Sequence, residues 1–193
     1  MSSHRWCLAG LMVVAAVGCS SAVPTETPGV ERLGDTVLRY SGPEAEAVLS
    51  YRYPQLNRTE DWLFLDVAIT AVNDPIEIDR KKVWVRTPAG EEIPLATQEE
   101  FRAAQGELAP KLARADVAGE PLGYFVGRIE KKLELFALPF EGLVYDSFWV
   151  TDREVYVGRL YFSIPGGVQT GRWELRMKLA ESEVRIPFRL EDE

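Results

Sequence analysis

Histidine and cysteine are nearly missing from this chain of 193 residues. The sequence has one histidine, His4, and two cysteines, Cys7 and Cys19, so neither type occurs after residue 19. Ser-His-Asp and Cys-His catalysis need an imidazole base, and zinc, copper, haem and iron–sulfur sites usually take His or Cys ligands. The chain beyond residue 19 therefore lacks the usual groups for these sites, and we predict no metal ion, no cofactor and no disulfide there.

Long apolar runs and basic clusters are also scarce. The apolar run at residues 6–18 has 13 residues, which is too short for a helix to cross roughly 30 Å of hydrocarbon. The formal charge of the chain is −8, and removal of residues 1–18 would leave 21 Lys and Arg against 30 Asp and Glu, or −9. This balance argues against binding nucleic acid or anionic lipid through overall charge alone. The densest basic run, Arg80-Lys81-Lys82, is predicted to belong to a solvated face.

The first 21 residues resemble the leader of a bacterial lipoprotein precursor. His4 and Arg5 precede the apolar run, and the run ends in small residues, as a cleavable leader requires. The box Ala16-Val17-Gly18-Cys19 places a cysteine directly after the cleavage position, with Ala16 where leucine is commonest in that family.

This resemblance implies a type II signal peptide at residues 1–18 and lipidation of Cys19, the new amino terminus. Several acyl chains would hold the protein firmly on a membrane. Ser20 after the cysteine is typical of lipoproteins sent to the outer membrane, facing the periplasm. The alternative is an ordinary secretory leader that leaves Cys19 as a free thiol. Residues 19–34 are rich in Ser, Thr, Pro and Gly, so we expect a flexible tether there.

Most of residues 35–193 show the period of β-strands. Residues 62–72 carry apolar side chains on both faces, which is typical of a central strand. The last two strands alternate apolar and charged residues as a hairpin with one wet face, and Pro187 places the final strand at a sheet edge. The alternation slips by one residue across Gly158, which predicts a β-bulge. Seven to nine short strands predict a mainly β fold, an antiparallel two-sheet sandwich with a helical insertion at about 97–145.

Residues 158–165 and the final hairpin resemble the closing strands of immunoglobulin-like domains in extracytoplasmic bacterial lipoproteins. The resemblance covers about the last 45 residues and lacks a Cys-Trp-Cys signature. It implies an immunoglobulin-like sandwich that serves as a binding or accessory module, and it carries over no catalytic residues.

The insertion changes to a helical period. Thr97 and Glu100 have the spacing of a capping box, and apolar residues follow at helical intervals as far as Ala115. Gly106 weakens this helix, and Pro110 is a point at which it could divide. The spacing of Phe125, Ile129, Leu133 and Phe136 predicts a second helix that ends before Pro139.

The insertion and its exit are rich in aromatic residues, and these are the candidate binding residues. Exposed together, they would form a surface for a peptide, a glycan or a partner protein; buried, they would be the floor on which the two helices pack. They are Tyr124, Phe125, Phe136, Phe140, Tyr145, Phe148 and Trp149.

These features favour a membrane-anchored, non-catalytic envelope lipoprotein that binds a protein or envelope partner. The alternatives are a carboxylate-dependent hydrolase of glycan or peptidoglycan and a periplasmic carrier of an apolar ligand. Paired acids in a cleft, one with a raised pKa, would favour the hydrolase, whereas an enclosed cavity of a few hundred Å³ would favour the carrier. The acids themselves are scattered and predicted to be solvated, with none in an EF-hand spacing; they are Asp66, Asp74, Asp79, Asp116, Asp146, Asp152 and Glu154.

Overall fold

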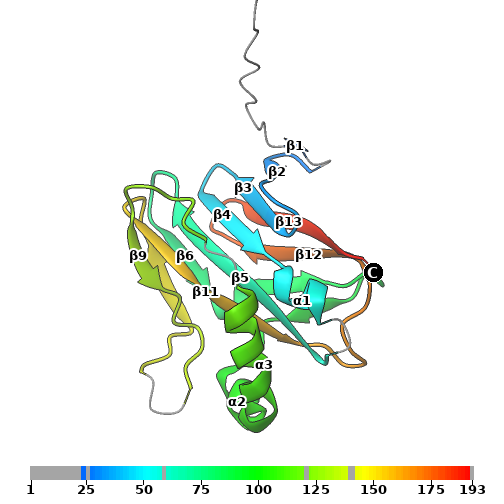
Figure 1. The fold of residues 1–193 in the computed structure, drawn as a ribbon. Helices are drawn as coiled ribbons and strands as arrows, with labels where there is room; N and C mark the ends of the chain where they lie inside the picture. Colours follow the sequence, from blue (N-terminus) through cyan, green and yellow to red (C-terminus); the bar gives the residue numbers. More distant parts are fainter. Residues whose placement is uncertain (1–22, 25–26, 58–59, 120–121, 139–141, 192–193) are drawn as a thin grey trace, which may run out of the picture.

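The fold is a mainly β sandwich, seen in a computed structural model that describes residues 23–24, 27–57, 60–119, 122–138 and 142–191 (Figure 1). Cys19, Phe140 and the leader lie outside the described residues. The larger sheet has the order β1 (Val23–Pro24), β2 (Val30–Arg32), β3 (Val37–Ser41), β4 (Ala45–Ser50), β5 (Trp62–Ala71), β11 (Glu154–Ser163) and β9 (Ile129–Lys132). The smaller sheet has the order β13 (Glu183–Leu190), β12 (Gly171–Lys178), β7 (Val83–Arg86) and β8 (Glu92–Pro94). A short ribbon pairs β6 (Ile76–Asp79) with β10 (Ser147–Val150). The mainly β class and the sandwich-like packing of antiparallel sheets are therefore confirmed.

Strand β5 is central in the larger sheet and is buried on both faces. Leu63 and Leu65 point into the core between the sheets, and Phe64 on the opposite face is equally buried. The helices α1 (Arg52–Leu56), α2 (Gln98–Ala103) and α3 (Gln105–Ala118) lie at this second face (Figure 1). Phe64 stacks with Tyr53 of α1 at 5.0 Å between ring centroids. The large sheet therefore has two covers, the smaller sheet and the helices. None of the described helices has the length and hydropathy to span a bilayer.

The final hairpin forms as expected. Strands β12 and β13 pair from Gly171↔Leu190 to Lys178↔Glu183, with alternate side chains buried. Strand β13 is the edge of its sheet, so Pro187 needs no ladder partner on its outer side.

The β-bulge predicted at Gly158 is wrong. Strand β11 pairs with β5 in one unbroken register from Tyr156↔Ile69 to Ser163↔Trp62. The apolar pattern shifts because both faces of β11 are covered: Val155 packs with Val37 and Val48 on the outer face, while Leu160 and Phe162 join the main core. Burial on both faces produces the same sequence pattern as a bulge.

The first predicted helix forms, with its capping box intact. Thr97 Oγ1 accepts a hydrogen bond from Glu100 N at 3.1 Å, and the Glu100 carboxylate accepts one from Thr97 N at 2.7 Å. The helix divides at Ala104, before Gly106, and α3 continues through Pro110. The helix is therefore divided at Ala104, six residues before Pro110, where the sequence suggested a break.

The second predicted helix is wrong. Ile129–Lys132 is the edge strand β9, which pairs in parallel with β11. The apolar residues that suggested one helical stripe pack in different places: Phe125 lies on the outer cluster with Val48, and Phe136 lies beside Phe101. Tertiary packing, and not the local period, decides the conformation here.

The tether predicted at residues 19–34 is wrong for its last part. Val30–Arg32, inside the range 19–34, forms β2 and pairs with β3, and Val30 is buried in the main core. Strand pairing therefore begins before residue 34.

A substitution at Gly158 tests the contact between β9 and β11. A Cβ on Gly158 would lie 2.7 Å from the Leu133 Cβ and 3.3 Å from its carbonyl oxygen. We expect Gly158→Ala to lower the free energy of unfolding by about 1 to 3 kcal/mol through overpacking, measured by urea denaturation. Gly106→Ala is the control, because nothing lies within 4 Å of its Cβ, and it should stabilise α3 by up to about 1 kcal/mol. Equal stability of Gly158→Ala and the natural chain would contradict the close approach.

Candidate functional site

The predicted aromatic surface divides into exposed and buried rings. Tyr124, Tyr145 and Trp149 are 41%, 45% and 62% exposed. Phe125 and Phe148 are half-buried, and Phe136 is buried. The predicted binding residues therefore include exposed rings, as a binding surface needs, and a buried ring that packs in the interior.

Phe136 belongs to the floor under the helices. Its ring lies 5.2 Å from Phe101 of α2 and 4.8 Å from Tyr161 of β11, measured between centroids. Burial raises the pKa of Tyr161 to about 12, so its hydroxyl stays protonated at neutral pH. Phe136 is therefore a packing residue.

The guanidinium of Arg80 fixes this floor from the side. It lies 4.6 Å from the Phe136 centroid, donates to the Ala96 carbonyl at 2.8 Å and donates to the Leu135 carbonyl. Asp146 accepts from its Nε at 3.3 Å. Burial lowers the pKa of Arg80, an effect that Asp146 opposes. The prediction that the run Arg80-Lys81-Lys82 is solvated is therefore wrong for Arg80, and no periodicity in the sequence marks it as buried.

Phe125 covers the outer face of the larger sheet at its other end. The Arg39 and Arg128 guanidinium carbons lie 6.0 Å and 5.3 Å from its ring centroid. Beneath the ring is a small apolar cluster that includes Val37 and Leu122. Phe125 is thus held between two cations and is not a free contact residue.

Tyr145 and Phe148 line a hollow of about 310 Å³ together with Tyr156, Glu134 and Ser147. Phe148 stacks on Tyr156 at 4.7 Å. Burial raises the pKa of Tyr156, and the charges of Glu154 and Glu134 add to that effect. Trp149 projects from the opposite face of β10, across from Glu77 of β6.

Exposed apolar side chains concentrate in the same part of the chain. The described residues include eight large hydrophobic side chains that are exposed, and seven of these lie between residues 117 and 149. The seven are Val117, Tyr124, Val126, Ile129, Leu143, Tyr145 and Trp149; the eighth is Leu56.

A second site is a charged cleft on the outer face of the larger sheet. The Arg159 Nε lies 2.6 Å from Asp66 Oδ1, and its Nη1 lies 2.9 Å from Asp116 Oδ1. Burial raises the pKa of Asp66, and the hydrogen bonds from Arg159 oppose that shift. The cleft measures about 620 Å³, and Lys132 and Tyr161 also line it. The sequence showed Asp66 and Asp116 as scattered acids, and only the fold brings them to one guanidinium.

Ion pairing restricts what the charged cleft can do. Arg159 remains protonated, because the hydrogen bond and charge of Asp66 raise its pKa despite burial. Both carboxylates therefore face a permanent cation, and neither is an unpaired acid or base. Within the described residues, no three His, Cys, Asp or Glu side chains converge as metal ligands would.

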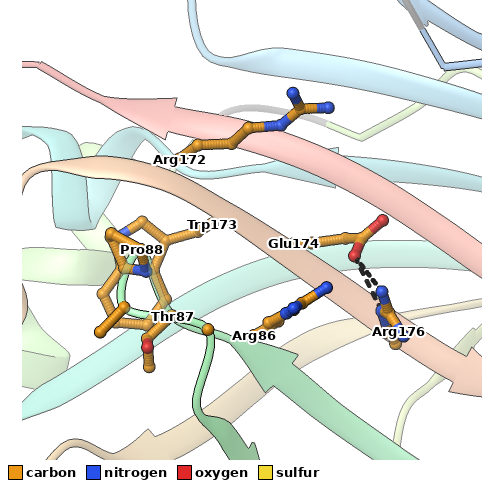
Figure 2. Close-up of a pocket in the computed structure, with 9 residues that line it drawn as sticks. Arg86, Thr87, Pro88, Arg172, Trp173, Glu174 and Arg176 are labelled. Atoms are coloured by element: carbon orange, nitrogen blue, oxygen red, sulfur yellow. Dashed lines mark hydrogen bonds and ion pairs between the residues drawn. The ribbon is translucent and has the colours of Figure 1, made fainter.

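A third hollow lies on the outer face of the smaller sheet (Figure 2). It measures about 520 Å³ and is lined by Arg86, Arg172, Glu174, Arg176 and the turn 87–90. Glu174 accepts from Arg176 Nε at 2.8 Å. The alternation of the final hairpin predicts Arg172 and Arg176 on its wet face, and the fold adds Arg86 of β7 to them.

The chain matches no family model, no curated protein and no solved structure.

The role of Arg159 can be tested through stability. We expect Arg159→Met to cost about 3 kcal/mol, because it leaves the Asp66 carboxylate buried without its partner. Asp116→Asn should change stability by less than about 1 kcal/mol, since the Asp116 side chain is 73% exposed. Without Arg159 the pKa of Asp66 in the folded protein should rise further above its value in the unfolded chain. The folded protein then binds the proton more tightly than the unfolded chain does, so its stability falls as the pH rises from the unfolded-state pKa to the folded-state pKa. The deficit of Arg159→Met in urea denaturation should therefore shrink at acidic pH, and a pH-independent deficit would contradict the buried-charge account.

Proposed function

We propose that the chain is a lipid-anchored, non-catalytic envelope lipoprotein that binds a protein or envelope partner through the exposed side chains of residues 117–149. The observation that carries this proposal is the concentration of seven of the eight exposed large hydrophobic side chains in that segment. Large contiguous patches of exposed apolar side chains mark interaction sites, whereas single exposed side chains are common on any protein surface, and we propose that these seven contribute to such a patch.

Trp149, Tyr145 and Leu143 are the most prominent exposed residues at the end of this segment, with Tyr145 at the hollow beside Tyr156 and Trp149 on the opposite face of β10. Tyrosine and tryptophan supply much of the contact energy in interfaces at a low cost in side-chain entropy. The support beneath them is firm: Tyr145 N donates to the Glu134 carbonyl at 3.1 Å, and β10 pairs with β6 over four residues. The exposed rings therefore project from ordered backbone.

Site-specific photocrosslinking tests the surface. A benzophenone amino acid at Trp149 should give a discrete crosslinked product in native envelopes, because Trp149 is 62% exposed at the proposed surface. Leu56 of α1 is the matched control position, since it is 57% exposed outside that segment.

The same products from both positions would contradict a binding surface at 117–149. The absence of a discrete crosslinked product at Trp149 would contradict it as well.

The anchor has a separate test. We expect the native protein to begin at Cys19 with acyl chains attached, because the box at residues 16–19 resembles a lipoprotein cleavage site. Mass spectrometry of the amino-terminal peptide should show the acyl masses, and Cys19→Ser should abolish incorporation of labelled palmitate. An unmodified thiol at Cys19, or an uncut leader, would contradict the anchor while leaving the crosslinking result intact.

The charged cleft gives a specific reason to keep the hydrolase as a second candidate. It contains two carboxylates and a raised pKa at Asp66, as a pair of catalytic acids would require. The Arg159 guanidinium that joins them favours a structural role, because a general acid or nucleophile needs a carboxyl group free to meet the substrate. The binding function therefore has the stronger support.

A further inference from the structure

Positive charge gathers on the outer face of the smaller sheet, although the chain as a whole carries −8. Strands β7, β12 and β13 place on this face the cations Arg86, Arg172, Arg176, Lys178, Arg185 and Arg189. The same face, with β8 included, holds three carboxylates, Glu92, Glu174 and Glu183. The overall acidity of the chain therefore conceals a basic surface.

The strand register sets like charges against one another on this surface. Arg172 lies directly opposite Arg189, and Arg176 lies opposite Arg185. Like charges at directly opposite positions of an antiparallel pair are destabilising. Arg176 and Arg185 are each relieved by a neighbouring carboxylate, Glu174 and Glu183. Arg189 has the weaker contact, 3.9 Å from Glu191 with both side chains largely exposed.

The basic surface continues around the sheet edge toward the amino terminus. Arg172 and Arg189 also line a second hollow, of about 340 Å³, together with Arg32 of β2 and Thr27. The hollow in Figure 2 shares Arg172 with it, so one arginine-lined path leads from Arg86 to Thr27. Arg32 is exposed, and one of its nitrogens donates to the Asp35 carbonyl at 2.7 Å.

The position of Thr27 fixes how far this surface can lie from the proposed anchor. Thr27 follows Cys19 by eight positions, and eight positions reach at most about 29 Å even when the chain is fully extended. A bilayer that holds acylated Cys19 would therefore lie within about 29 Å of Thr27, which lines the same hollow as Arg32, Arg172 and Arg189.

We propose that the arginine surface around Arg32, Arg86, Arg172 and Arg189 docks on the anionic phosphate headgroups of the membrane that holds the lipid anchor. This inference rests on the proposed anchoring at Cys19. Guanidinium groups donate in pairs to phosphate oxygens, and cations close to an anionic leaflet add to the hold of acyl chains.

Vesicle binding by a chain without acyl groups tests the proposal. The mature chain from residue 19 with Cys19→Ser is mixed with phosphatidylcholine vesicles made with or without phosphatidylglycerol, and binding is measured by cosedimentation. We expect binding to the anionic vesicles that weakens as ionic strength rises. The double reversal Arg172→Glu with Arg189→Glu should weaken it by about tenfold or more.

The control is a reversal of equal charge elsewhere, Arg102→Glu with Lys131→Glu. Both of these side chains are exposed, on α2 and β9, and this variant should keep most of the binding. Equal binding to both kinds of vesicle, no effect of the Arg172 and Arg189 reversals, or an equal loss in the control would each overturn the proposal. The vesicle assay contains no acyl chain on the protein. A failure to bind vesicles would therefore not contradict lipidation of Cys19, and a lack of lipidation at Cys19 would not prevent the measurement of headgroup binding.

Discussion

Burial of β5 on both faces is the constraint on which the rest of this molecule depends. A sheet whose central strand has Leu63 and Leu65 on one face and Phe64 on the other cannot leave either face to water. The smaller sheet covers the first face. The second face needs another cover: Tyr53 of α1 stacks on Phe64, and α2, α3 and the rings of Phe101 and Phe136 pack beside Tyr161 of β11. The insertion is therefore part of the core.

Two buried cations lie where this cover meets the sheet. Arg80, directly after β6, donates to the carbonyls of Ala96 and Leu135 and to Asp146, and Arg159 of β11 donates to Asp116 of α3. Buried ion pairs add little net stability, because desolvation offsets most of the attraction. Their effect is greatest on alignment, since a guanidinium with several fixed acceptors holds its partners in one arrangement. Apolar packing thus holds the helices and the segment around Phe136 on the sheet, and Arg80 and Arg159 fix the positions of these segments relative to the strands.

The sequence predicts the parts of this fold in which the local pattern and the tertiary environment agree. The hairpin of β12 and β13 has one wet face and one buried face, so alternation identifies it, and the capping box at Thr97 depends on neighbours three residues apart. Strand β9 was missed because its pairing with β11 is non-local. The false bulge at Gly158 arose because a strand covered on both faces loses its alternation. The charged cleft was missed because its contacts are also non-local. Asp66, Asp116 and Arg159 are far apart in sequence, and they pair only once α3 lies over the sheet.

The aromatic set shows how one segment can be both core and surface. On a strand, neighbouring side chains point to opposite sides, so β10 directs Phe148 inward onto Tyr156 and Trp149 outward to solvent. The inward ring stabilises the strand from which the outward ring projects. Exposing tryptophan on ordered backbone costs solubility, and no packing requirement of this fold explains Trp149, because its neighbours Phe148 and Val150 already fill the inner side. Tryptophan is among the residues that contribute most to interface energy, and the partner surface proposed for this chain is therefore centred on Trp149 and not on the buried rings beside it.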